Sequence, residues 1–399
     1  MPTGERPVGI FCLYNLRKLA YNEENFMRGC EKMKQVRDRN PAMDVVRCFA
    51  LLCVNALHFF GYTDLYWKPT QGMEMCVALI FRSFFMVCVP LFVMLSGYLM
   101  CHKELSRKYY QGIFRTLGTY VLASLFVIGA YHVFNILFYR ERVSITEQLL
   151  GIFSFTTIPY AWYVEMYIGL FLLIPFLNIL YRNLPSQKSK QVLILIMLFL
   201  TSAPSLLNVH NFRDLSWWLR PSSSNQYHPL IPAFWVDMYP ITYYFIGCYL
   251  REYPLRMKKR TNLLLTAAIA VAAGCYTFYR CYGENFIWGI WKEMESPFFG
   301  AIGALVFSLL GQGKYASMGM GLRKVLARVS GWCFGAYLVS WIVEQYVYMI
   351  PLQFDVQVRY WQGPLLVPVV YVVSLAISAG LNGIYGALAS LAGKRGRAV

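Results

Sequence analysis

The chain has 399 residues, of which 57% are hydrophobic and only 14% are charged, and its formal net charge is +17. Soluble domains are about half apolar and a quarter charged, and disordered chains are poor in apolar residues, so this composition excludes both classes. It predicts a polytopic membrane protein built from apolar helices.

Ten apolar segments have a length suited to a membrane-spanning helix. They cover residues 42–62, 75–100, 112–139, 162–181, 190–207, 234–250, 261–279, 297–312, 332–350 and 364–390. No linker or repeat interrupts them, so residues 42–390 are predicted to form one all-α membrane domain with about ten transmembrane helices. Residues 1–41 precede it as a polar tail, either unstructured or partly amphipathic, and residues 391–399 follow it as a short basic tail.

The distribution of Lys and Arg predicts the orientation. If residues 1–41 lie in the cytoplasm, the segments on that side carry 26 of the 37 Lys and Arg residues, and the opposite loops carry eight. Basic loops stay in the cytoplasm, so both termini are predicted to be cytoplasmic, in a multi-pass protein of the plasma membrane. The charge is then explained by topology and by anionic lipids, and it requires no nucleic-acid partner. The eleven cysteines show neither metal-ligand spacing nor a disulfide framework, so neither a metal site nor a structural disulfide is predicted.

The first apolar segment contains three ionisable residues: Asp44, Arg47 and His58. Eleven helical steps separate Arg47 from His58, which puts both on one helix face, roughly 16 Å apart along the axis. Ionisable groups in a membrane helix are costly unless they face a protein interior or a wet cavity, so they indicate a functional site. Alternatively, Asp44 and Arg47 form an interfacial pair that fixes the depth of the helix, and His58 is a core histidine. Asn55, on nearly the same face, either orients the imidazole, donates to a reacting oxygen or satisfies a backbone group.

Further charged residues lie in or near the later segments. Arg115 opens the third segment and follows Lys108. Three acids occur within later segments, at Glu165, Asp237 and Glu344, and Arg82 in the second segment is the obvious partner for one of them. A carboxylate in such a segment must be protonated, paired or hydrated.

Five motifs in a fixed order carry a family resemblance. They are Asp44-x-x-Arg47-x10-His58, Val89-Pro-Leu-Phe-Val-Met-Leu-Ser96-Gly97-Tyr98-Leu99, Trp162-Tyr163 with Gly169-Leu-Phe-Leu-Leu-Ile-Pro175, Tyr244-Phe-Ile-Gly247-Cys-Tyr249-Leu250, and Phe334-Gly335-Ala-Tyr337-Leu338. Together they cover about residues 42–345, and the series resembles the acyltransferase-3 family of bacterial integral membrane acyltransferases.

This resemblance implies transfer of an acyl group, usually acetyl, from acyl-CoA on the cytoplasmic side to a hydroxyl of a cell-surface glycan or a related acceptor. Family members often carry R-x-x-R at the start of the third span, where it is thought to bind the donor's phosphates. Arg115 matches the second position, but Gly112 occupies the first. Arg107 or Lys108 is expected to substitute for the missing arginine electrostatically, although lysine lacks the paired donors of a guanidinium. Two histidines frequent in the family are replaced here by Tyr160 and Ser340.

We therefore expect His58 to act as the general base, because a neutral imidazole is suited to removing a hydroxyl proton. Asp44 and Arg47 complete the expected catalytic group, and Arg47 also binds the donor. Glu165 and Trp162 are expected at the acceptor end. No Ser or Cys stands at a motif position beside His58, so direct transfer without an acyl-enzyme is the default.

The alternative function is a small-solute transporter whose buried charges line its path. The two halves of the sequence do not repeat, and no paired broken helices occupy corresponding positions, which favours the enzyme.

Overall fold

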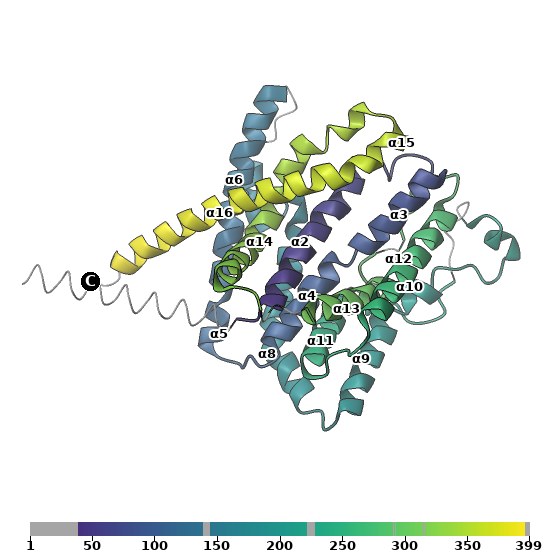
Figure 1. The fold of residues 1–399 in the computed structure, drawn as a ribbon, viewed down its shortest axis with the longest axis horizontal. Coiled ribbons are helices and arrows are strands. Elements are labelled where there is room, and N and C mark those ends of the chain that lie inside the picture. The colour runs from purple at the N-terminus through teal and green to yellow at the C-terminus, as the bar shows by residue number, and fades with distance from the viewer. Residues whose placement is uncertain are drawn as a thin grey trace, which may run out of the picture.

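The computed structural model describes residues 39–138, 144–221, 228–289, 291, 293–313, 315 and 317–395. The tail predicted for residues 1–41 therefore lies almost entirely outside the described residues, as do residues 396–399. The described part of the chain is an all-helical bundle without strands (Figure 1), which confirms the all-α class. Whether residues 42–390 form the domain as bounded by the sequence stays a prediction.

Seven stretches of helix among the described residues are long and apolar enough to cross a membrane. They are Pro41–Tyr62, Met73–Met100, Arg107–Ile136, Pro159–Arg182, Lys259–Cys281, Met320–Gln353 and Tyr360–Ser390. The helices within them are α2 (Pro41–Tyr62), α3 (Met73–Phe85), α4 (Cys88–Met100), α5 (Arg107–Gln111), α6 (Ile113–Phe138), η1 (Pro159–Ala161), α8 (Trp162–Arg182), α12 (Lys259–Cys281), α14 (Met320–Val347), η6 (Pro351–Gln353), η7 (Tyr360–Gln362) and α16 (Gly363–Arg395). These stretches correspond to seven of the ten predicted segments.

The other three predicted segments form shorter helices: α9 (Gln187–Thr201), α11 (Tyr239–Glu252) and α13 (Pro297–Gly311). With 14 or 15 residues each, they extend roughly 22 Å, which is less than the hydrocarbon thickness of a bilayer. Proline marks the first turn of α11 and α13, and α9 is followed by a turn before α10 (Pro204–Leu207). The described helices thus support seven spans, and the count of ten stays a prediction.

Smaller elements connect these helices: α7 (Ile145–Phe153), η2 (Leu215–Trp218), η4 (Val236–Met238) and α15 (Val356–Arg359). Helix α2 lies in the middle of the bundle and packs against α3, α4, α13, α14 and α16 (Figure 1). Its start is well defined, because the Asn40 side chain accepts a hydrogen bond from the Ala42 amide at 3.0 Å and Pro41 occupies the first helical position. The central position of α2 puts its charged residues inside the protein.

Two glycines allow α4 and α11 to approach each other closely. A Cβ on Gly97 would lie 2.1 Å from the Tyr244 carbonyl oxygen, and one on Gly247 would lie 2.0 Å from the Met94 carbonyl oxygen. Both glycines belong to motifs of the family resemblance, so here those motifs encode backbone contact between two helices.

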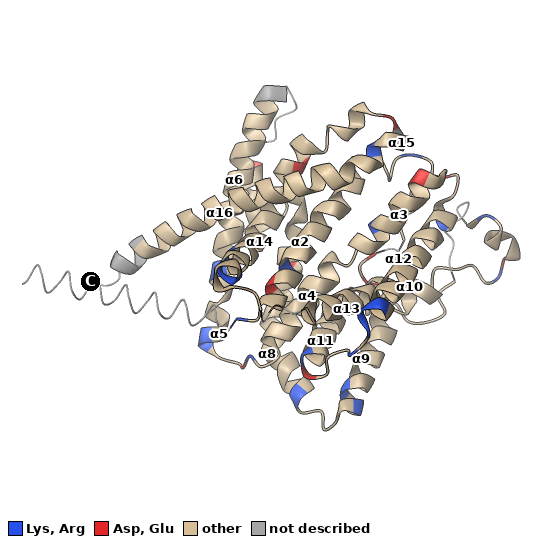
Figure 2. Ribbon diagram, in the orientation of Figure 1, with Lys and Arg blue, Asp and Glu red and all other residues tan. Residues whose placement is uncertain are grey.

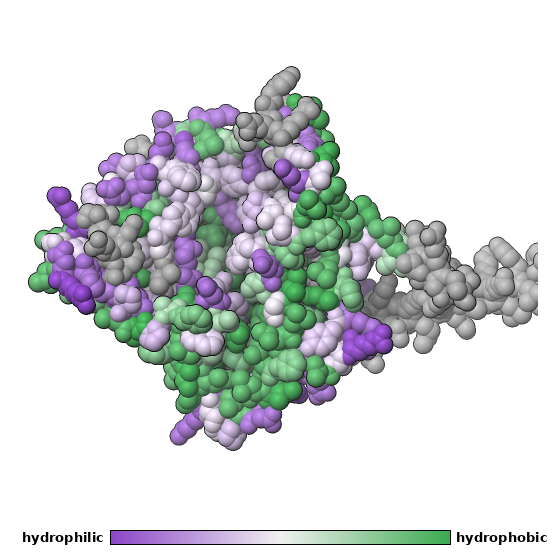
Figure 3. Space-filling model, turned by 180° about the vertical axis from the view of Figure 1, so that it is seen from behind, coloured by the Kyte–Doolittle hydropathy of each residue, from purple (hydrophilic) through white to green (hydrophobic). Residues whose placement is uncertain are grey.

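The surface of the bundle fits a lipid environment. Large apolar side chains are exposed along α8 and α9, among them Leu172, Phe176, Leu195 and Phe199. Figure 3 shows a broad apolar area over the lower part of the face seen from behind. Figure 2 shows Lys and Arg gathered at the ends of α5, α9, α12 and α14. Apolar sides and a basic end are the pattern of a multi-pass membrane protein.

Gly97→Ala should destabilise the protein by about 1–3 kcal/mol, because the added methyl group meets rigid backbone of α11. Thermal unfolding in detergent would measure the loss. Gly169→Ala is the matched control, since a Cβ at Gly169 in α8 meets nothing within 4 Å. Equal stability of the two variants would contradict the close contact between α4 and α11.

Candidate active site

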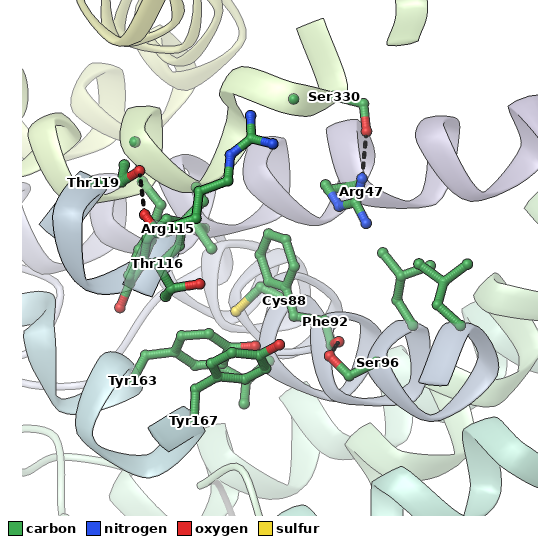
Figure 4. A pocket seen from close by; sticks show the side chains of 18 of the residues that line it. Arg47, Cys88, Phe92, Ser96, Arg115, Thr116, Thr119, Tyr163, Tyr167 and Ser330 are labelled. Atoms are coloured by element: carbon green, nitrogen blue, oxygen red, sulfur yellow. Dashed lines mark hydrogen bonds between the residues drawn. The ribbon is translucent and has the colours of Figure 1, made fainter. Parts of the chain in front are cut away.

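The largest concentration of predicted site residues surrounds a cavity of about 450 Å³ between α2, α4, α6, α8 and α14 (Figure 4). Arg47, His58, Arg115 and Trp162 line it, although they come from three helices far apart in the sequence. Its wall also includes Arg39, Val54, Leu57, Cys88, Phe92, Ser96, Thr116, Thr119, Tyr163, Tyr167, Met294, Ser330, Phe334, Tyr337 and Asn382. One cavity is therefore lined both by arginines and by a histidine.

The cationic end is organised around Asp44, which is buried near the start of α2. Its carboxylate accepts hydrogen bonds from Arg39, whose Nε lies 2.9 Å from Oδ1, and Arg47 Nη1 lies 3.8 Å from the same oxygen. Ser330 on α14 accepts hydrogen bonds from Arg47 at 2.8 Å and from Arg39 at 3.3 Å. Asp44 is therefore an anchor that holds two guanidinium groups at the cavity.

Arg115 enters the cavity from α6, on the opposite side from Arg47 (Figure 4). It lies within the first turn of α6, and its backbone carbonyl accepts a hydrogen bond from the Thr119 hydroxyl at 2.9 Å. Lys108, by contrast, lies exposed on α5 and does not line the cavity. The third cation at the cavity is thus Arg39, which sequence reasoning did not select.

At the other end, His58 forms a pair with a buried acid. Its Nδ1 lies 3.1 Å from Oε1 of Glu344 on α14, and Glu344 has no exposed surface. Oε2 of the same carboxylate accepts a hydrogen bond from the Tyr160 hydroxyl, and the Tyr160 ring stacks on the imidazole at 3.9 Å between centroids. Next to an ionised carboxylate, which only accepts, a neutral His58 would hold its proton on Nδ1 and present the lone pair of Nε2 to a substrate.

Tyrosines extend this arrangement toward the ends of α2 and α14. The Tyr62 hydroxyl lies 3.4 Å from that of Tyr160, and Gln345 donates to Tyr62 at 2.7 Å. Tyr337 donates to the Tyr160 backbone carbonyl. These contacts hold Tyr160 in place against His58.

The structure separates some predicted residues from this site. Glu165 is exposed on α8 and does not line the cavity. Asn55 has no exposed surface and also lies outside the lining, and neither polar atom of its side chain has a hydrogen-bond partner among the described residues. Arg82 donates to the Tyr66 hydroxyl at 2.9 Å, and its guanidinium carbon lies 4.8 Å from the centre of the Phe286 ring.

Glu344 is the residue that sequence reasoning undervalued. It is one of three acids in apolar segments, and the sequence pattern favours a role in the site for Glu165, near Trp162, and not for Glu344. The signal was present, because an acid in the middle of an apolar segment requires a partner, and His58 required one too. The sequence contains no information that pairs two particular residues 286 positions apart.

A further acidic residue lies just outside the cavity. Met294 lines the cavity from the segment before α13, where its carbonyl accepts a hydrogen bond from the Tyr243 hydroxyl at 2.6 Å. The next residue, Glu295, is buried, and this burial raises the pKa of its carboxyl to about 7, with a contribution from the negative charges of Glu293 and Asp237. No group of three or more His, Cys, Asp or Glu residues suited to a metal ion occurs in the described part of the chain.

Comparison with known proteins assigns a family. A family model described as an acyltransferase domain, that of the acyltransferase-3 family, matches residues 40–383. This range contains all the cavity-lining residues except Arg39. No curated protein and no solved structure gave a match.

The buried Glu295 should make stability depend on pH. An unfolded glutamate has a pKa of about 4.3, so between that value and about 7 the folded state holds a proton that the unfolded state releases. The resulting stabilisation is lost as the pH rises through about 7. Thermal unfolding between pH 5 and 8 should show a falling midpoint in the wild type and a flatter profile in Glu295→Gln. Glu147→Gln, on the exposed face of α7, should keep the wild-type profile, and a wild-type profile in Glu295→Gln would contradict the assignment.

Proposed function

Since the chain belongs to the acyltransferase-3 family and is therefore a multi-pass membrane acyltransferase, we propose that it transfers an acyl group, first of all acetyl, from acyl-CoA to a hydroxyl of a cell-surface glycan or another envelope component. The proposal includes a bacterial plasma membrane and cytoplasmic termini. The observation that carries it is the single cavity that joins three arginines to the His58–Glu344 pair.

The cationic end suits the phosphates of the donor. Arg39, Arg47 and Arg115 line the cavity there, and guanidinium groups bind phosphate through paired hydrogen bonds. Asp44 neutralises part of this charge and keeps two of the three groups in place. Arg39 thereby supplies a cation that the missing first arginine of the R-x-x-R motif would otherwise provide.

The distance between the two ends suits an extended donor. Arg47 and His58 are about three turns apart on α2, roughly 16 Å along the axis, which is comparable to the length of a pantetheine arm. Arg47 lies near the start of α2 and Arg115 near the start of α6, each next to a segment that the positive-inside rule assigns to the cytoplasm. Donor phosphates can therefore stay near the cytoplasm while the thioester reaches His58.

The His58–Glu344 pair supports base catalysis. Nε2 of His58 takes the proton of the acceptor hydroxyl as its oxygen forms a bond to the thioester carbon. Glu344 stabilises the imidazolium that results, because its carboxylate is hydrogen-bonded to Nδ1. When the carbon–sulfur bond breaks, the same proton passes from Nε2 to the departing thiolate, so the products are an ester and free CoA thiol.

The acceptor end is assigned to Trp162, which lines the cavity and is 41% exposed, so its ring can stack against a sugar. Glu165 and Asn55 lie outside the lining and are left out of the proposed machinery. The family assignment also favours this enzyme over the transporter alternative.

His58→Ala should lower kcat by about 10²–10⁴-fold, because the general base is lost. Acceptor-dependent release of CoA thiol by the purified protein in detergent would measure it. Cys88→Ala is the control, since Cys88 lines the same cavity and direct transfer does not need its thiol. Full turnover by His58→Ala would exclude the mechanism. If Cys88→Ala loses turnover and a thioester on Cys88 can be trapped in the wild type, the reaction proceeds through an acyl-enzyme instead of direct transfer.

Arg115→Ala should raise the KM for acyl-CoA by about 10- to 100-fold with little change in kcat, because a phosphate contact distant from the reacting bond gives uniform binding. Initial rates at varied donor concentration would show it. Lys108→Ala should have a much smaller effect, since Lys108 lies outside the cavity lining. An equal rise in KM for both variants would indicate that basic residues attract the donor phosphates in general, and that Arg115 makes no specific contact with them.

A further inference from the structure

Tyr163, next to Trp162 at the start of α8, has no role in the mechanism described so far. Its side chain lines the cavity, yet the residue is only 8% exposed. Figure 4 shows it beside Tyr167, with no hydrogen bond drawn to its hydroxyl. Within the part of the chain that the structure describes, this hydroxyl has no hydrogen-bond partner.

Several other hydroxyl groups in and around the cavity have a partner within the protein. Tyr160 donates to Glu344, and Tyr337 donates to the Tyr160 carbonyl. On α4, Ser96 donates to the Phe92 carbonyl at 3.0 Å. The Tyr163 hydroxyl is not closed off from the cavity that its residue lines, so a ligand bound there can accept its hydrogen bond.

The ring of Tyr163 is held in position by aromatic neighbours. It packs edge to face against Tyr337 with 5.8 Å between centroids, lies 6.0 Å from Phe92, and is parallel to Tyr167 at 6.3 Å. Such contacts fix the direction of the hydroxyl without using it. A donor that is fixed before the substrate binds needs no reorganisation during the reaction.

Tyr163 lines the same cavity as His58, and a series of ring contacts connects the two residues. The Tyr337 ring that it contacts lies 6.1 Å from that of Tyr160, which stacks on His58. Tyr160 and Tyr163 are separated by one helical turn, so the base and this free hydroxyl are positioned by the same short segment. The reacting carbonyl must lie close to His58, and therefore in this region.

We propose that the Tyr163 hydroxyl donates a hydrogen bond to the thioester carbonyl oxygen as it becomes an oxyanion. The proposal rests on acyl-CoA being the donor. Tyr163 forms no covalent bond and keeps its proton throughout, while His58 carries the transferred proton. The hydrogen bond strengthens as negative charge develops on the oxygen, so it lowers the barrier more than it tightens binding of the ground state.

The test is Tyr163→Phe in the full-length protein, which removes the hydroxyl and keeps the ring. Removing one oxyanion donor typically lowers kcat by about 10²–10³-fold, and the donor KM should change little. Because this hydroxyl has no partner in the described protein, the melting midpoint should equal that of wild type. Tyr109→Phe is the matched control: its hydroxyl donates to the Phe171 carbonyl at 2.6 Å outside the cavity, so it should lower the midpoint and spare kcat.

A second variant covers the case in which Tyr163→Phe does not fold. Replacing Tyr163 with 3-fluorotyrosine keeps the hydroxyl and makes it a stronger donor, so kcat should rise at a pH where the phenol is still protonated. Wild-type kcat in both variants, or a change confined to the acceptor KM, would overturn the proposal. If the Tyr163 variants behave like wild type but His58→Ala abolishes transfer, only the role of Tyr163 is excluded and the proposed function stands. Absence of acyl-CoA turnover in the wild type would instead overturn the proposed function and this inference with it.

Discussion

The buried carboxylate of Glu344 is the constraint on which the rest of the site depends. A carboxyl group without exposed surface is costly to bury unless it has hydrogen-bond partners, and among the described residues Glu344 contacts His58 and Tyr160. These three residues come from α14, α2 and η1, so satisfying one charge fixes the mutual position of three elements. The contact that satisfies the buried Glu344 is therefore also the one that would orient His58 for its proposed role as the base.

A second polar cluster follows the same rule at the other end of the cavity. Asp44 lies buried between Arg39 and Arg47, and Ser330 of α14 receives hydrogen bonds from both. Helices α2 and α14 are thus joined twice, once near each end, with apolar side chains such as Leu57 and Phe92 along the cavity between. Polar contacts at both ends and an apolar middle resist sliding of one helix along the other. This keeps Ser330 of α14 beside Arg47 and Glu344 of α14 beside His58.

Much of this arrangement was predictable from the periodicity of one helix. The spacing in α2 places Arg47 and His58 on one face, and both line the cavity. Hydropathy identifies seven segments that the structure forms as long helices, but it cannot separate them from the shorter α9, α11 and α13, because prolines and turns shorten a helix without lowering its hydropathy. The Glu344 partner of His58 was not predictable, since pairing across 286 residues depends on packing that one sequence does not reveal.

Two residues that depart from the family pattern, Tyr160 and Ser340, make specific hydrogen bonds near Glu344. Tyr160 stands where a histidine is frequent in the family, and here it donates to Glu344 and stacks on His58. Ser340 stands at the other such position, one turn before Glu344, and its hydroxyl donates to the Tyr337 carbonyl at 2.9 Å. A neutral tyrosine beside the carboxylate adds a donor without adding a second titrating imidazole. Among the described residues, His58 is thus the one imidazole in contact with Glu344, which agrees with its proposed role as the base.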